Sequence, residues 1–189
     1  INIPSNTAAS DYVVHVDHTR HLFRFGTGAR SDFIIHEDYQ QYRNVLYSLF
    51  NSVTLHQFSW FRDQGTASDP NHSRDVNATE ELTKNGVEIL GESLFSARPA
   101  SEPMWVANLH SAELRDAVTI RLNYLTGITK GKVHRWIVNN QLLHGRFYED
   151  RLGDKNFSPQ LFKTVRAADP YPDLLLNDLD VVATGNHNL

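Results

Sequence analysis

The stretch "RWIVNNQLLHG", Arg135 to Gly145, carries the clearest fold signal in this sequence. Its short apolar run, Trp136 to Val138, is typical of a strand buried on both faces. The run stops at three side-chain amides, Asn139, Asn140 and Gln141. Polar groups at the end of a buried strand indicate a binding site, yet an amide cannot transfer a proton at neutral pH. The stretch therefore predicts a site-like strand end without an ionisable group, with Trp136 itself in the core.

Outward from this strand, segments with a strand pattern alternate with segments of helical spacing. Strands are predicted over 11–18, 21–30, 51–60, 87–95, 133–140 and 173–178, and helices over 38–50, 75–86, 111–129 and 158–170. The helix over 111–129 is expected to be capped by Ser111. Its apolar stripe consists of Leu114, Ala117, Val118, Leu122 and Leu125. Such alternation is typical of parallel βα units, with about five parallel strands in this chain.

Composition excludes several classes of function. The chain has 189 residues, which suits one domain, and a formal net charge of −4 with both signs interspersed. The absence of a basic stripe argues against nucleic acid as a partner, and the apolar runs are too short to cross a membrane. There are no cysteines to form disulfides or thiolate metal sites. Along a strand His15 and His21 face one way and His18 the other, so these histidines do not converge on a metal. We expect neither a metal nor a cofactor.

Three sequons indicate the compartment. Asn71, Asn77 and Asn156 each begin an Asn-X-Ser/Thr pattern, although Pro159 should disfavour use of the third. No signal peptide is visible at Ile1, and a mature chain would have lost one. We therefore expect a secreted, glycosylated protein.

Several motifs together carry a family resemblance. "GKVHRWIVNNQLLHGRFYEDRLG" followed by "LFKTVRAADPYPDLLLND" resembles glycoside hydrolase family 10, the xylanases and related β-1,4-glycanases. Upstream, "TRHLFRFGTGA", "FNSVTLHQFSWF", "NGVEILGESLFSA" and "PMWVANLHSAELRDAV" resemble earlier segments of the same family, in the same order. The similarity covers about residues 12–185. It implies a (β/α)8 TIM-barrel fold, with residues 1–11 as a lead-in segment and residues 12–189 as the N-terminal part of the barrel.

The resemblance breaks at the residues that carry the family's chemistry. Gln141 stands at the position of the acid/base Glu, which protonates the leaving oxygen in retaining glycosidases. Gln141 has nearly the same shape but no proton to give. Asn140 matches the Asn that binds the sugar next to the cleavage point. His56, Gln57 and Ser59 replace a Glu, an Asn and a Lys, whereas Trp60 is kept.

Further departures fall on neighbouring strands. Glu92 replaces the substrate-binding His, Ser96 and Ala97 replace a Trp-His pair, and Ile137 replaces an Asp. Of the final N-D-Y motif, Asn177 and Asp178 are kept and Leu179 replaces the Tyr. The family's nucleophile Glu lies on a later strand, beyond Leu189. As a replacement acid, Glu92 is less favoured than as a polar group in a remodelled cleft. Glu149 and Asp150 are expected in a solvated loop or at a helix cap.

About five strands cannot close an eight-stranded barrel. An open sheet edge and exposed apolar helix faces would make such a chain poorly soluble alone. We therefore expect a second chain, a cleaved partner or an oligomer neighbour to complete the barrel. A rebuilt open five-stranded sheet is the less favoured alternative.

These expectations lead to three functional hypotheses. The first is a catalytically inactive, xylanase-like, secreted protein that acts as a structural, storage or binding subunit of a larger assembly. The second is an active β-1,4-glycanase completed by a partner chain. The third is a protein that binds a glycan or an apolar small molecule in the remodelled barrel mouth. The candidate ligand-binding residues are His56, Gln57, Trp60, Glu92, Asn140, Gln141 and Asn177.

Overall fold

The computed structural model describes residues 13, 15–17, 22–63, 65–66 and 69–181, so the predicted lead-in segment 1–11 lies outside the described residues. Five strands form one sheet: β1 (Gly26–Ala29), β2 (Ser52–Leu55), β3 (Glu88–Ser96), β4 (Arg135–Asn140) and β5 (Asp173–Leu175). The α-helices are α1 (Ser31–Ile35), α2 (Gln40–Leu49), α3 (Ser73–Lys84), α4 (Met104–Ala107), α5 (Ser111–Thr129), α6 (Phe147–Leu152) and α7 (Phe157–Ala168). Short 3-10 turns are η2 (Glu37–Tyr39), η3 (His56–Phe58), η4 (Trp60–Arg62) and η5 (Pro99–Ser101).

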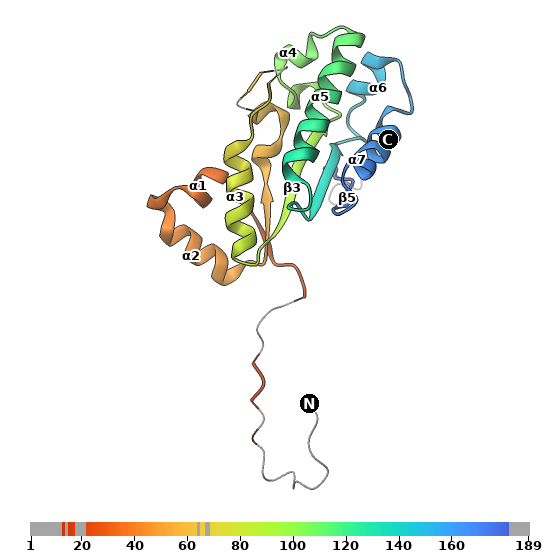
Figure 1. Cartoon of the computed structure of the whole chain (residues 1–189). Coiled ribbons are helices and arrows are strands. Elements are labelled where there is room, and N and C mark those ends of the chain that lie inside the picture. Colours follow the sequence, from red (N-terminus) through yellow and green to blue (C-terminus); the bar gives the residue numbers. More distant parts are fainter. Residues whose placement is uncertain (1–12, 14, 18–21, 64, 67–68, 182–189) are drawn as a thin grey trace.

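Each strand pairs in parallel with the next strand along the chain, in the order β1-β2-β3-β4-β5. The helices between successive strands gather on one face of the sheet (Figure 1). This is the arrangement of consecutive βα units in a (β/α)8 barrel, as predicted, and it brings all the carboxyl ends of the strands to one edge.

The long helix α5 confirms the predicted stripe, because every residue of that stripe is buried. The predicted cap was wrong. Ser111 is the first helical residue and His110 is the N-cap, whose backbone N–H donates to the Glu113 carboxylate at 2.9 Å. A glutamate three residues after the cap satisfies one of the unpaired amides at the helix start.

Trp136 lies in the core at 1 % exposure, as predicted, and meets the Phe58 ring edge-on. The space for its indole comes from Gly91 on the neighbouring strand. A Cβ at Gly91 would lie 2.2 Å from the indole ring, so any side chain there would displace Trp136. The register of β3 and β4 shifts between Glu92 and Phe95, where the strands approach the site.

The first predicted strands were partly wrong. Residues 13 and 15–17 belong to no strand, and β1 is confined to Gly26–Ala29. Phe23 and Phe25, which precede β1, are 71 % and 48 % exposed. The strand predicted over 51–60 ends at Leu55, after which the chain turns into η3 and η4.

The face of the sheet away from the helices is open. Val53 and Ile89 point to the helices and are fully buried, while the residues alternating with them face the other way. That face carries a hollow of about 420 Å³ lined mainly by small and polar residues: Arg24, Gly26, Thr27, Gly28, Ser52, Thr54, His56, Leu90, Glu92 and Arg135. Among the described residues, no helix is long and apolar enough to cross a membrane.

Candidate functional site

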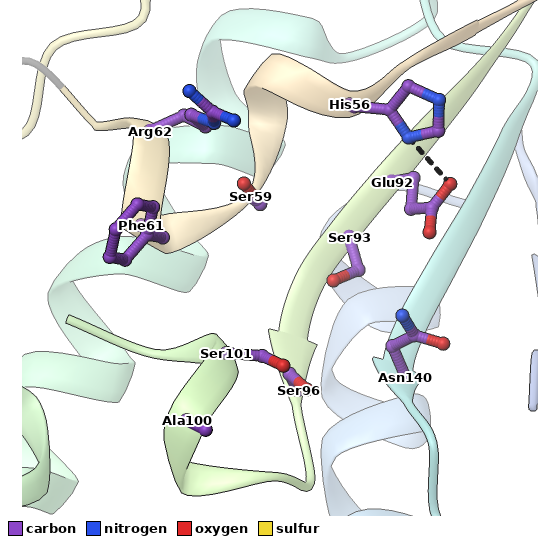
Figure 2. A pocket seen from close by; sticks show the side chains of 10 residues that line it. All are labelled: His56, Ser59, Phe61, Arg62, Glu92, Ser93, Ser96, Ala100, Ser101 and Asn140. Atoms are coloured by element: carbon purple, nitrogen blue, oxygen red, sulfur yellow. Dashed lines mark ion pairs between the residues drawn. The ribbon is translucent and has the colours of Figure 1, made fainter. Parts of the chain in front are cut away.

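A pocket of about 290 Å³ lies where β2, β3 and β4 end. Figure 2 shows side chains from β3 and β4, and from η3, η4, η5 and the residue between η3 and η4, arranged around it. The lining residues are His56, Ser59, Phe61, Arg62, Glu92, Ser93, Ser96, Ala100, Ser101 and Asn140. Hydroxyl groups and charges dominate this set, so the pocket suits a polar, hydroxyl-rich ligand better than an apolar one.

His56 and Glu92 form the charged pair of the pocket. The His56 Nδ1 lies 2.9 Å from a carboxylate oxygen of Glu92 (Figure 2). This hydrogen bond raises the pKa of His56 above its ordinary value, against the opposing effect of partial burial. On the other side of the ring, Nε2 faces Gly28, where an added Cβ would lie only 2.9 Å away. Gly28 therefore makes room for the imidazole that meets Glu92.

The ends of β4 and β5 are tied together by amides. The Asn177 Nδ2 donates to the Asn140 Oδ1 at 2.9 Å, and the Gln141 backbone N–H donates to the Asn177 carbonyl at 2.9 Å. A further contact joins the two segments that follow these strands: the Asp178 carboxylate accepts a hydrogen bond from the Leu143 backbone N–H at 2.6 Å. These contacts orient the Asn140 side chain at the pocket wall.

Gln141 itself has a left-handed backbone, with a φ of 63° that is uncommon outside glycine. Its Oε1 is buried without a hydrogen-bond partner among the described residues, and so is the Oε1 of Gln57. A buried carbonyl oxygen without a donor is costly, so each of these atoms is a natural acceptor for a ligand hydroxyl. Neither side chain lines the 290 Å³ pocket.

The structure thus brings together three of the predicted ligand-binding residues, His56, Glu92 and Asn140, in one pocket. Trp60 is only 4 % exposed and packs against Phe95, so its ring lies in the core beneath the site. Ser96 and Ala97, where space was expected, are also buried, although Ser96 still reaches the pocket wall.

The sequence analysis missed several pocket residues, chiefly Arg62, Ser93 and Ser101. The strand predicted over 51–60 hid the turns η3 and η4, and these turns place Arg62 at the pocket. The sequence signal for Arg62 is the run "SWFR", which begins inside the predicted strand and continues past it. A strand that ended at Leu55 would have left this run in a turn near the site.

A buried polar cluster supports the pocket from below. The Glu102 carboxylate accepts from the Ser96 backbone N–H and from the Tyr148 hydroxyl, both at 2.6 Å. Burial raises the pKa of Glu102 to about 7. Beside it Arg121, 1 % exposed, donates to the Phe58 carbonyl at 2.6 Å. Burial lowers the pKa of Arg121 to about 10, which leaves the guanidinium charged at neutral pH.

Other charged residues lie apart from the pocket. Glu149, expected in a solvated loop or at a helix cap, lies in the first turn of α6. It is only 8 % exposed and accepts from the Ser158 hydroxyl of α7, so the expectation of a solvated side chain was wrong. Asp150 is exposed, as predicted, with its carboxylate 3.6 Å from Arg146. Among the described residues, no group of three His, Asp or Glu side chains could hold a metal ion. His15 is exposed, and His18 and His21 lie outside the described residues.

The three sequon asparagines, Asn71, Asn77 and Asn156, are all exposed. Their partner hydroxyls differ. The Ser73 hydroxyl is exposed and donates to the Asn71 Oδ1 at 2.7 Å. The hydroxyls of Thr79 and Ser158 are buried and bound to other groups.

Comparison with known proteins identifies the relatives of this fold. No protein-family model matches the sequence. The chain is 29% identical over 170 residues to endo-1,4-beta-xylanase 1 of Arabidopsis thaliana, covering 89% of this chain and 18% of that protein. Native xylanase 10B from Thermotoga maritima superposes with a TM-score of 0.71 at 20% identity, covering 81% of this chain and 49% of that one. GH10 from Paenibacillus barcinonensis has a TM-score of 0.71 at 20% identity, with coverage of 82% and 51%.

The chain therefore spans about a fifth of the length of this curated relative and about half of these solved barrels. The sequence match extends over 89% of this chain, and the superposition extends over 81% of it. The chain is thus similar in sequence to endo-1,4-beta-xylanases over most of its length, and it has the fold of part of the (β/α)8 barrel of the solved xylanases.

Proposed function

We propose that this chain is part of a secreted, xylanase-like protein that binds a β-1,4-linked glycan without hydrolysing it. It serves as a binding, structural or storage subunit of a larger assembly. The observation that carries the proposal is Gln141, an amide at the position where the family resemblance puts the acid/base carboxylic acid. An amide can hydrogen-bond a glycosidic oxygen, but it cannot protonate the leaving group.

The remaining carboxylates offer no clear replacement. A retaining mechanism needs an acid/base and a nucleophile about 5 Å apart. Glu92 is the only carboxylate among the residues that line the pocket, and it is already paired with His56. Its position between the imidazole and the serine hydroxyls suits a hydrogen-bonding wall of a binding pocket.

Binding is supported by the groups that line the pocket. Asn140 is oriented by Asn177, and Ser59, Ser93 and Ser101 add hydroxyl groups. A saccharide brings many hydroxyl groups that can donate to and accept from such side chains. The polar lining gives an apolar ligand less support.

Completion of the barrel is part of the proposal. Within the described sheet, β1 and β5 each pair on one side only, which leaves two edges open. The inner face is a hollow lined by small residues such as Gly26 and Ser52, whereas a closed barrel packs its interior with bulky side chains. On the outside, α2 exposes Val45 at 51 % and Leu49 at 62 %. We infer that further βα units, in the same polypeptide or in a partner, cover these edges and fill the hollow.

The decisive experiment compares binding with turnover. The purified protein is tested with xylohexaose by isothermal titration calorimetry, and with soluble xylan by release of reducing ends. We expect saturable binding and no release, both for the natural protein and for Gln141→Glu. Hydrolysis by the natural protein would establish the alternative of an active glycanase completed by a partner. Native mass spectrometry tests the assembly, and a stable, soluble monomer of this chain's mass would refute it.

A further inference from the structure

The pocket contains an arginine that forms no ion pair among the described residues. Its titratable lining residues are His56, Arg62 and Glu92. Glu92 is paired with the His56 imidazole 2.9 Å away. Arg62 has no carboxylate within ion-pair distance among the described residues. Its guanidinium lies 5.9 Å from the ring centre of its own neighbour Phe61.

Arg62 is placed to act inside the pocket. It ends η4, the turn that follows β2, and Figure 2 shows its side chain on the same wall as Ser59. Arg62 is close enough to interact electrostatically with His56. Its positive charge lowers the pKa of His56, although the hydrogen bond with Glu92 has the larger effect and raises that pKa overall. A guanidinium presents two parallel N–H donors that match the two oxygens of a carboxylate.

The rest of the wall suits a saccharide. Ser59, Ser93 and Ser101 contribute hydroxyl groups that can both donate and accept hydrogen bonds. Asn140 adds an amide whose orientation is set by Asn177. A neutral sugar would use these groups and leave the arginine in water, whereas an acidic sugar would use both.

We propose that this pocket selects a saccharide that carries a uronate, with the carboxylate bound by Arg62 and the hydroxyls bound by the serines and Asn140. The inference rests on the glycan binding proposed above and adds its specificity. The shared chemistry is a hexuronate carboxylate. It has two sources, glucuronate side groups on a xylan chain and the galacturonate backbone of pectic chains.

Three ligands separate these possibilities in calorimetric titrations of the complete protein. They are neutral xylotetraose, a xylo-oligosaccharide of similar size bearing one glucuronate, and tetragalacturonate. We expect the acidic ligands to bind about tenfold more tightly than xylotetraose, in line with a charge-assisted bidentate contact. Raising the salt concentration should weaken only the acidic ligands. The tighter of the two acidic ligands identifies the source.

Arg62→Gln should reduce the affinity for the acidic ligands to that of xylotetraose and leave xylotetraose unchanged. The matched control is Arg146→Gln, an exposed arginine beside α6 that does not line the pocket and should have no effect. Equal affinity for neutral and acidic ligands, or an Arg62→Gln variant that keeps the preference, would overturn this inference and leave the proposed function standing. Failure of all three ligands to bind would overturn the proposed function, and the specificity with it.

Discussion

Replacement of Glu102 by glutamine should remove a pH-dependent loss of stability. The carboxyl is almost completely buried, and burial raises its pKa from 4.5 to about 7. A carboxyl whose pKa is raised on folding binds more protons in the folded state. Its contribution to stability is therefore complete below pH 4.5 and is lost as the pH rises through 7. The difference between the two pKa values corresponds to about 3 kcal/mol.

Glutamine keeps the contacts but not the titration. Its carbonyl oxygen can accept the hydrogen bonds from the Ser96 backbone N–H and the Tyr148 hydroxyl that Glu102 now accepts. Urea unfolding at pH 4.5 and pH 8.5 measures the effect. We expect Glu102→Gln to match the natural protein at pH 4.5 and to exceed its free energy of unfolding by about 2–3 kcal/mol at pH 8.5.

A second variant separates charge from packing. Glu102→Ala leaves the two donors without an acceptor, so it should be less stable at both pH values by about 1–3 kcal/mol for each lost partner. If Glu102→Gln and the natural protein show the same dependence on pH, the Glu102 carboxyl does not titrate in this range and the reasoning fails.

Three further outcomes are expected. Arg121→Met should lower the free energy of unfolding by about 3–5 kcal/mol in urea titrations, because Asp63 loses its buried partner; a loss under 1 kcal/mol would contradict this role. Gly28→Ala should push the imidazole from Glu92 and lower the pKa of His56 in an NMR titration, and an unchanged pKa would argue against the crowding. With an added secretion leader in a eukaryotic host, intact mass should show a glycan at Asn71 that Asn71→Gln removes; an unmodified Asn71 would refute the expectation.

The strands and helices that the sequence predicted well are those whose own residues show a clear apolar pattern. The helix α5 and the strands β3 and β4 carry their own apolar pattern, so local periodicity located them within about two residues. The segment before β1 failed because Phe23 and Phe25 look like a buried strand face. A strand face is buried only if another element covers it, and these two rings remain largely exposed.

Some residues of the site could be predicted from local sequence, and others could not. The strand end at Asn140 could be read from the sequence, because an apolar run stops there and parallel strands end at one edge. The pairing of His56 with Glu92 could not, since it joins residues far apart in the chain through a turn that was predicted as strand. The next turn, η4, placed Arg62 at the pocket.

By itself the sequence determined the order of βα units, the family resemblance and the presence of an amide, Gln141, just after the fourth strand, because these depend on residue identity and local spacing. Only the tertiary structure decided that Glu149 is buried, that Trp60 lies in the core and that Arg62 lines the pocket with no ion-pair partner among the described residues. Burial and pairing depend on contacts between distant segments. Those contacts exist only once the sheet has assembled and its helices have packed against one face.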